Sequence, residues 1–372
     1  MKLVIDLLDF ECGRSYGYQE YLLNLLDDFH SHRSDILASQ VILLVKNSEL
    51  IFFSERYNDV FEYLPYECGG YLNTLFTRSK AIHKMRLSSN DVLLFTGNTM
   101  PLFHSQAKTI LVIHDLLYLY RSLFSKSVYY FIFRLQRRLF VPYSIYKANK
   151  IIAISQFTRD EIIKAYSTSS SKISVIYNYF NFEKYNDDIT HKSTINKKYI
   201  LSICAKYKHK NHITILKAFE QFYAKHKNFC LVIIGSLSPE AIDYISKLGK
   251  DIKHNIIVCQ HLNNSDIKKM YENASVYVSA SLYEGLGMPV VEALYFGLPT
   301  LLSDIPIHHE VSLENAQFFT PMSSLELSKL MELSVVKNKS HNREFIHKLK
   351  EMYSTENTSL RYIREINLFH KV

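Results

Sequence analysis

The chain has 372 residues, of which 47% are hydrophobic and 22% charged, so it can build two cores of ordinary domain size and extensive disorder is excluded. Its formal net charge of +8 favours anionic partners such as nucleotides, phosphates, nucleic acid or an acidic membrane, although a positive balance also serves solubility alone. None of the five cysteines forms a CxxC pair, which indicates a reducing compartment and no zinc site.

The N-terminal segment MKLVIDLLDF places Asp6 and Asp9 where a signal peptide would have its apolar core. No stretch reaches the length of a membrane span. We therefore expect a cytoplasmic protein.

Short apolar runs alternate with helical patterns along the chain. The first half predicts strands at KLVIDLL, QVILLVK, DVLLFTG, TILVIH, KIIAIS and KISVIY, with helices such as YGYQEYLLNLLDDF and SQFTRDEIIKAY. The second half predicts strands at YILSIC, FCLVIIG, NIIVC, SVYVSA, PTLLSD and AQFF, with helices such as HITILKAFEQFYAKH. Because most runs are continuous rather than alternating, both faces of each strand are covered, which is typical of parallel sheets with helices on both sides.

A polar, aperiodic segment at residues 181–198 separates the two series, and a new strand begins directly after it. It predicts a linker between two Rossmann-like domains, residues 1–180 and 199–353. Residues 354–372 predict a terminal helix, which we expect to pack back on the N-terminal domain. The fold class is α/β, with two doubly wound domains facing a cleft, and ligands of such sheets bind beyond the carboxyl ends of the strands.

The segment EGLGMPVVEAL, residues 284–294, follows a predicted strand. Pro289 fits the first turn of a helix that Gly297 ends. The turn before this helix has backbone amides at the positive end of the helix dipole, where phosphate or sugar can bind, and its glycines permit close approach or positive φ. This turn consists of Gly285, Leu286, Gly287 and Met288.

Glu284 and Glu292 bracket the turn. Carboxylates accept hydrogen bonds from the vicinal hydroxyls of ribose and hexoses, so one nucleotide sugar could touch Glu292, the amides and Glu284 in turn. Two alternatives stay open. One is an ordinary strand–turn–helix with both glutamates at the surface. The other is a partial G-x-G-x-x-G dinucleotide site, in which Val290 replaces the third glycine and Asp304 has the offset of a ribose-binding acid.

The stretch SLYEGLGMPVVEALYFGLPT resembles the E-x7-E signature of retaining GT-B glycosyltransferases of family 4, in their mannosyltransferase-like branch. Leu286 stands where that family usually has phenylalanine, and Ala280 where it has proline. Similar segments occur along nearly the whole chain, namely VIHDLLYLY, ANKIIAISQFTRDEI, KISVIYN, HKNH and SDIPIHHEV.

The resemblance implies a role for each matching residue. Glu284 would hold donor-sugar hydroxyls, Glu292 would bind the ribose, and the turn amides would support the sugar and diphosphate. The N-terminal domain would bind the acceptor and the C-terminal domain the nucleotide sugar. The remaining implied residues are Lys210 and Lys206, which would neutralise the diphosphate, His114 on the acceptor side, and Gly17, which would let the N-terminal loop approach both ligands.

Breaking a sugar–phosphate bond places negative charge on the diphosphate, and fixed cations and amides lower that barrier. The resemblance implies retention of configuration without a metal, and no DxD follows an apolar strand. It implies transfer of a hexose from a UDP- or GDP-linked donor to a lipid-linked or oligosaccharide acceptor, in bacterial surface polysaccharide synthesis such as that of O-antigen and lipopolysaccharide.

Simpler alternatives remain for single residues and for the whole chain. His114 could be a structural histidine at a strand end, Lys210 a solvated charge and Gly17 a turn glycine. The whole chain could instead be an NAD-dependent Rossmann oxidoreductase. A nucleic-acid binder is a third class, although no helix-turn-helix, RRM or zinc pattern supports it.

The segment YYFIFRLQRRLFV, residues 129–141, mixes aromatic residues with three arginines. Such a helix is typical of an anionic membrane surface, although a core helix with a solvated basic edge fits equally well. Peripheral contact with the inner face of the cytoplasmic membrane is therefore a hypothesis. The nearby segment TRSKAIHKMR adds Arg78, Lys80, Lys84 and Arg86.

Overall fold

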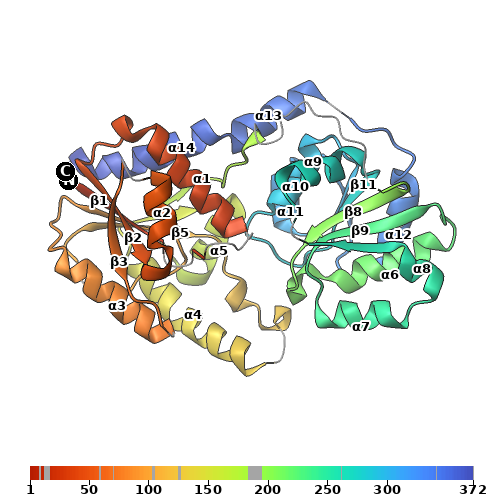
Figure 1. Cartoon of the computed structure of the whole chain (residues 1–372), viewed down its shortest axis with the longest axis horizontal. Coiled ribbons are helices and arrows are strands. Elements are labelled where there is room, and N and C mark those ends of the chain that lie inside the picture. Colours follow the sequence, from red (N-terminus) through yellow and green to blue (C-terminus); the bar gives the residue numbers. More distant parts are fainter. Residues whose placement is uncertain are drawn as a thin grey trace. The chain divides into compact units, whose positions relative to one another are not determined.

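The computed structural model describes residues 1–7, 10–11, 17–57, 60–69, 71–102, 105–124, 127–182, 195–260, 262–340 and 342–371. The chain divides into two compact units (Figure 1). Unit 1 comprises residues 1–119, 127–179 and 353–372, and unit 2 comprises residues 120–126 and 180–352. Each unit contains one sheet whose neighbouring strands are all parallel, which confirms the predicted α/β class.

The sheet of unit 1 has the strand order β3-β2-β1-β4-β5-β6-β7. The chain moves outward from β1 to β3, then returns and moves outward in the other direction from β4. The strand order therefore reverses between β1 and β4. The strands are β1 (Lys2–Asp6), β2 (Gln40–Lys46), β3 (Glu62–Tyr66), β4 (Val92–Phe95), β5 (Lys108–Ile113), β6 (Lys150–Ala153) and β7 (Ile173–Val175).

Helices cover this sheet on both faces. Buried side chains of α3, α4 and α5 share one hydrophobic cluster with the sheet, so these three helices pack on the same face. The last helix, α14, returns to unit 1 and packs against α1, where the Tyr21 and Tyr362 hydroxyls lie 2.8 Å apart. The helices are α1 (Gly17–Ser31), α2 (Leu50–Tyr57), α3 (Tyr71–Lys84), α4 (Val128–Lys147), α5 (Gln156–Tyr166) and α14 (Thr355–Asn367).

The sheet of unit 2 has the order β10-β9-β8-β11-β12-β13, with the reversal between β8 and β11. Its strands are β8 (Lys198–Cys204), β9 (Phe229–Gly235), β10 (Ile256–Cys259), β11 (Val276–Ser279), β12 (Thr300–Ser303) and β13 (Gln317–Phe319).

The helices of unit 2 begin at residues typical of helix N-termini. Ser238 accepts a hydrogen bond from the Ala241 amide before Pro239 opens α7, and Ser323 accepts one from the Glu326 amide at the start of α12. The helices are α6 (His212–Tyr223), α7 (Pro239–Lys247), α8 (Lys250–His254), α9 (Asn264–Asn273), α10 (Met288–Tyr295), α11 (Pro306–Ser312), α12 (Ser324–Ser334) and α13 (Arg343–Tyr353), which ends where the chain returns to unit 1.

Each of the twelve sequence-predicted runs contains a strand, but β3 was missed. Its sequence, EYLPY, is only partly buried and contains Pro65. Proline is tolerated in edge strands because only one side needs backbone donors, and β3 is the edge of its sheet. Of the expected linker at 181–198, residues 183–194 lie outside the described residues.

Candidate functional site

The candidate site lies in unit 2 where the strand order reverses. In doubly wound sheets the connections on either side of this point leave toward opposite faces, which opens a crevice beyond the carboxyl ends of the two central strands. The residues that follow β8 and β11 include Lys210 and Glu284, whose strands are neighbours in the sheet. Lys210 and Glu284 are 74 positions apart in the chain, but both lie beyond the carboxyl ends of these two strands, where their side chains meet.

Lys210 and Glu284 form an ion pair, with Lys210 Nζ 2.5 Å from Glu284 Oε1. Ser281 Oγ donates a second hydrogen bond to the same oxygen, at 2.6 Å. Burial alone would raise the pKa of the Glu284 carboxyl, but the charges of Lys210 and His209 and the two hydrogen bonds lower it to about 2. The site therefore holds a carboxylate and an ammonium, both mostly buried, in direct contact at neutral pH.

Backbone contacts fix the two loops to one another. The Leu282 amide donates to the His209 carbonyl at 2.7 Å, and Asn211 Nδ2 donates to the Ala280 carbonyl at 3.1 Å. Asn211 takes the left-handed conformation, with φ of 54°, at the N-cap of α6. Its side chain accepts no hydrogen bond from a backbone amide of that helix, but its Oδ1 accepts from the Thr214 hydroxyl of α6 at 3.0 Å, so Asn211 links the start of α6 to the neighbouring loop.

The glycine turn predicted from the sequence precedes α10. Gly287 adopts φ of 93°, which a residue with a side chain rarely takes, whereas Gly285 does not have positive φ. Helix α10 begins at Met288, with Pro289 in its first turn. Leu286 is buried, so within the turn it serves packing through its side chain and leaves only its backbone for a ligand.

Glu292 occupies the second turn of α10 and is buried. The Tyr271 hydroxyl donates to Glu292 Oε2 at 2.6 Å and also lies 3.3 Å from the Pro289 carbonyl. This contact ties the start of α10 to α9 and orients the carboxylate.

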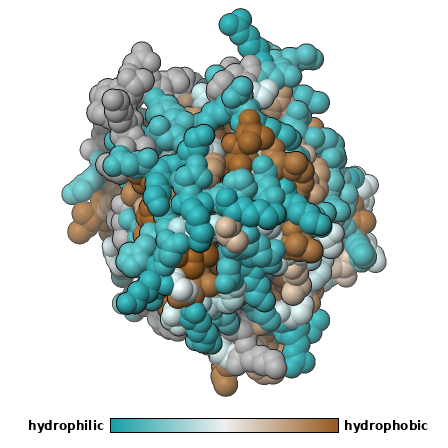
Figure 2. Space-filling view, turned by 90° about the vertical axis from the view of Figure 1, so that its right-hand side faces the viewer, coloured by the Kyte–Doolittle hydropathy of each residue, from teal (hydrophilic) through white to brown (hydrophobic). Residues whose placement is uncertain are grey.

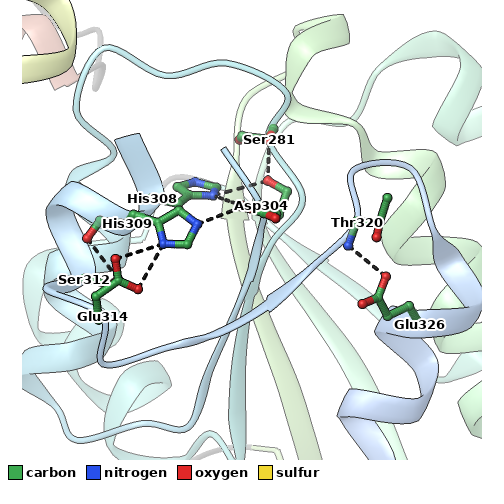
Figure 3. Close-up of polar contacts among 9 residues, drawn as sticks. Ser281, Asp304, His308, His309, Ser312, Glu314, Thr320 and Glu326 are labelled. Atoms are coloured by element: carbon green, nitrogen blue, oxygen red, sulfur yellow. Dashed lines mark hydrogen bonds and ion pairs between the residues drawn. The ribbon is translucent and has the colours of Figure 1, made fainter. Parts of the chain in front are cut away.

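The buried His308 lies close to Ser281, as Figure 3 shows. His308 Nδ1 lies 2.8 Å from the Ser303 carbonyl, which can only accept, so Nδ1 carries the proton. The Ser303 hydroxyl donates to the Ser281 carbonyl, which links this histidine to the residue that bonds Glu284. Burial lowers the pKa of His308 to about 4. A neutral imidazole is therefore part of the frame of the site.

The adjacent His309 has the opposite environment (Figure 3). Its Nε2 lies 2.7 Å from Asp304 Oδ1 and its Nδ1 lies 3.0 Å from Glu314. Hydrogen bonds to these two carboxylates raise the pKa of His309. Its ring also stacks on Phe318, with 3.8 Å between ring centroids. Asp304, the ribose-binding candidate of the dinucleotide alternative, is thus engaged in an ion pair with His309.

A second polar group lies at the corresponding reversal point of unit 1, between β1 and β4. His114 Nε2 lies 2.7 Å from the Thr96 carbonyl, so Nε2 donates. The Tyr18 hydroxyl lies 2.9 Å from Thr96 Oγ1, and the rings of Tyr18 and Tyr21 meet His114 edge-on. Gly17 is the first residue of α1, and a side chain there would meet nothing within 4 Å.

Of the predicted residues, the structure brings together Glu284, Lys210 and Gly287, whose added Cβ would lie 3.9 Å from Glu284 Cγ. Lys206 is exposed on the same loop as Lys210. His114 and Gly17 belong to unit 1. Sequence reasoning missed the supporting residues Ser281, Tyr271 and His308. Among the described residues, no group of three or more His, Cys, Asp or Glu side chains is placed to hold a metal ion.

Two family profiles match the chain. The family described as Glycosyltransferase Family 4 matches residues 40–184, and the family described as Glycosyl transferases group 1 matches residues 186–352. These adjoining matches fall in units 1 and 2 respectively for nearly all their length.

Curated relatives match at modest identity. The O-antigen chain mannosyltransferase RfbU of Salmonella typhimurium is 27% identical over 239 residues, which is 64% of this chain and 63% of that protein. A capsular polysaccharide biosynthesis glycosyltransferase, CapM of Staphylococcus aureus, is 26% identical over 191 residues, 48% of this chain and 49% of the relative. The chain thus matches less than two thirds of the length of these relatives.

Solved structures share the fold over the whole chain. Sucrose-phosphate synthase from Thermosynechococcus elongatus has a TM-score of 0.76 at 12% identity and covers 100% of both chains. HepE of Anabaena, solved in complex with UDP and glucose, has a TM-score of 0.69 at 15% identity and covers 99% of this chain and 100% of that one.

Proposed function

This chain is a GT-B glycosyltransferase of the family 4 type, and we propose that it transfers a hexose, with retention of configuration, from a nucleoside diphosphate sugar to a glycan acceptor. The observation that carries this proposal is the Lys210–Glu284 pair at the reversal point of unit 2. Lys210 offers a cation for a diphosphate, and Glu284, in direct contact with it, offers a carboxylate for sugar hydroxyls.

Binding of the donor would break the contact between Lys210 and Glu284, and each side chain would bind a different part of the donor instead. The diphosphate would take hydrogen bonds from Lys210 and from the amides at the start of α10, where the helix dipole favours negative charge. The sugar hydroxyls would donate to Glu284, which its low pKa keeps ionised. Glu292 is the candidate for the ribose hydroxyls, and Lys206 is a second cation on the Lys210 loop.

The reaction breaks the bond between the anomeric carbon and the diphosphate oxygen, and the electron pair leaves with the diphosphate. Lys210 and the turn amides would stabilise that developing charge, which is the part of the barrier a preorganised site lowers most. The acceptor hydroxyl would attack from the face that the diphosphate leaves and pass its proton to a departing phosphate oxygen, which retains the configuration. We propose that no metal is needed, because the fixed positive groups supply the charge.

The remaining candidate residues, His114 and Gly17, belong to unit 1. The Nε2 of His114 donates to the Thr96 carbonyl, and the edge contacts of Tyr18 and Tyr21 hold the ring in place. We assign His114 to contact with the acceptor or the donor sugar, and Gly17 to the approach of the N-terminal loop.

The relatives support a biological setting. Their names concern O-antigen chains and capsular polysaccharide, so we propose an oligosaccharide or lipid-linked acceptor in bacterial surface polysaccharide synthesis. A UDP- or GDP-linked hexose is the proposed donor. The NAD-dependent alternative is not favoured, because its ribose-binding candidate Asp304 pairs with His309.

The test is a nucleotide-release screen of the purified chain with UDP-, GDP- and dTDP-sugars, with and without EDTA. We expect release from one donor class, unchanged by EDTA, and loss of release in Glu284→Ala while the far-UV circular dichroism is kept. Proton NMR of the product should show the anomeric configuration of the donor. Wild-type release by the Glu284→Ala variant, or thermal stabilisation by NAD and by no nucleotide sugar, would overturn the assignment.

A further inference from the structure

One row of apolar side chains runs along the outer side of α4. Its members are Val128, Ile132, Leu135, Leu139 and Tyr146, all of which are exposed. They recur at intervals of three, four or seven residues, which places them on one side of the helix. At 1.5 Å per residue the row is about 27 Å long. A helix that covers a sheet normally presents polar residues on this side.

The packing of α4 does not need this row. Val141 and Ile145, on the inner side, belong to the hydrophobic cluster beneath the helix. Arg134 is buried, and its Nε donates to the Tyr118 carbonyl at 3.0 Å. The Met100 amide donates to the Ser144 hydroxyl at 2.8 Å. The helix is therefore anchored from its inner side, and the exposed row has no structural task within unit 1.

Isolated exposed apolar residues are normal and need no explanation. Figure 2 shows such a face, on which hydrophobic residues occupy separate small areas among hydrophilic ones. In unit 2, Ile242 on α7 and Leu325 and Leu333 on α12 are exposed in this way. The α4 row differs because five members share one side of one helix.

The charged residues of α3 and α4 are all basic. Helix α4 has no Asp or Glu in 20 residues, and its outer half carries Arg138 next to Leu139. Helix α3 packs on the same face of the sheet, also has no acidic residue, and exposes Phe76, Lys80 and Lys84. The opposite helix α1, by contrast, contains Glu20, Asp27 and Asp28. Helix α5, also on the α3–α4 face, has both signs.

We propose that the outer surface of α3 and α4 docks on an anionic lipid surface. The α4 row would enter the boundary between headgroups and acyl chains, while Arg138, Lys80 and Lys84 would contact the headgroups. A second copy of the chain fits less well. Arg138 lies near the middle of the row, so parallel or antiparallel pairing of two α4 helices would set this arginine against its own copy.

Among the described residues, no helix has the length and apolar character needed to cross a bilayer. The docking would therefore be interfacial. This inference stands on the surface alone and holds whichever sugar the chain transfers.

The first experiment is flotation of the full chain with vesicles of phosphatidylcholine, with or without 30% phosphatidylglycerol. We expect binding to the anionic vesicles, and a loss of at least tenfold in the triple variant Ile132→Ser, Leu135→Ser, Leu139→Ser. The matched control replaces Ile242, Leu325 and Leu333 by serine. The control side chains are 58%, 60% and 60% exposed, against 47%, 50% and 63% in the test set, so both variants remove similar apolar surface. The control should bind as wild type does.

A charge variant is a separate arm in case the triple variant fails to fold. Lys80→Gln, Lys84→Gln and Arg138→Gln leave the apolar row intact and remove three positive charges. Each basic side chain near an anionic surface contributes roughly a fivefold gain in binding, so together they should account for roughly a hundredfold. Raising the salt concentration should weaken wild-type binding in the same direction.

The absence of tryptophan from the chain permits a direct readout of insertion. Leu135→Trp places a single fluorescent tryptophan in the row on α4, and Leu333→Trp places one on α12. We expect a blue shift on mixing with anionic vesicles for the first and none for the second. The proposal is overturned if wild type does not float, if both triple variants bind equally, or if the row instead mediates a dimer that the triple variant dissociates in sedimentation without lipid binding.

Discussion

Replacing Glu284 by glutamine tests the central contact of the site, because it removes the charge and keeps the shape. The pKa of this carboxyl falls from 4.5 to about 2 in the folded chain. At about 1.4 kcal/mol per pKa unit, the folded state favours the ionised form by about 3 kcal/mol. Since the folded-state pKa lies below the unfolded one, this stabilisation is complete above pH 4.5 and is lost as the pH falls toward 2.

Urea unfolding at pH 7.5 should show the Glu284→Gln variant less stable by up to about 3 kcal/mol, less whatever Lys210 recovers by turning to water. At pH 3.5 the difference should shrink by about 1.4 kcal/mol, because Glu284 is then mostly protonated in the unfolded wild-type chain but still ionised in the folded one. Nucleotide release should fall by about 10²–10³-fold, the usual cost of one preorganised polar group.

The control is Glu314→Gln, which breaks the exposed pair with His309 and should change stability by less than about 1 kcal/mol. Equal stability of wild type and Glu284→Gln at pH 7.5 would show that the ion pair does not form in solution. Undiminished release by the variant would remove the proposed role of the carboxylate.

Three further predictions concern the frame around the two sites. Asp6→Asn leaves Arg78 buried without its ion-pair partner, so urea unfolding should show a loss of about 3–5 kcal/mol. Burial lowers the pKa of His308 from 6.5 to about 4, so the unfolded chain takes up a proton at this residue before the folded chain does. The contribution of His308 to the free energy of unfolding is therefore complete above pH 6.5 and falls by about 1.4 kcal/mol per pH unit below it. The His308→Gln variant should lack this contribution to the pH dependence of stability between pH 6.5 and 5. Tyr362→Phe leaves the buried Tyr21 hydroxyl unpaired and should cost about 1–3 kcal/mol, whereas the double variant with Tyr21→Phe should recover part of this loss in a double-mutant cycle.

The pattern of the chain predicts the layers of the fold well, because buried parallel strands leave a strong signal. Continuous runs such as QVILLVK and FCLVIIG are apolar on both faces and match β2 and β9 from end to end. The edge strand β3 lacks that signal, because an edge strand has one neighbour, is partly exposed and tolerates Pro65.

The site was predictable only where its chemistry is local. The positive φ of Gly287 and the helix start at Pro289 follow from the turn itself. The pairing of Lys210 with Glu284 depends on β8 lying beside β11, and strand order is not encoded in the pattern of any one strand. The two adjacent histidines of α11 show the same limit. His308 is buried, whereas His309 is paired with acidic side chains. The two histidines are neighbours in the chain, so their local sequence does not reveal which of them is buried.

The ion pair of Lys210 with Glu284 also restricts which ligands could bind at this position. A ligand that offers only a phosphate draws Lys210 away and leaves a mostly buried Glu284 without its counter-charge, which opposes binding. A free sugar has the converse effect, because it occupies the carboxylate but gives the ammonium no anion. The proposed nucleoside diphosphate sugar would replace both partners at once, since its hydroxyls would donate to Glu284 while its phosphates would accept from Lys210. If the proposed function is correct, the Lys210–Glu284 contact would favour the intact donor over either of its halves, and cleavage of the donor would weaken the binding of both products.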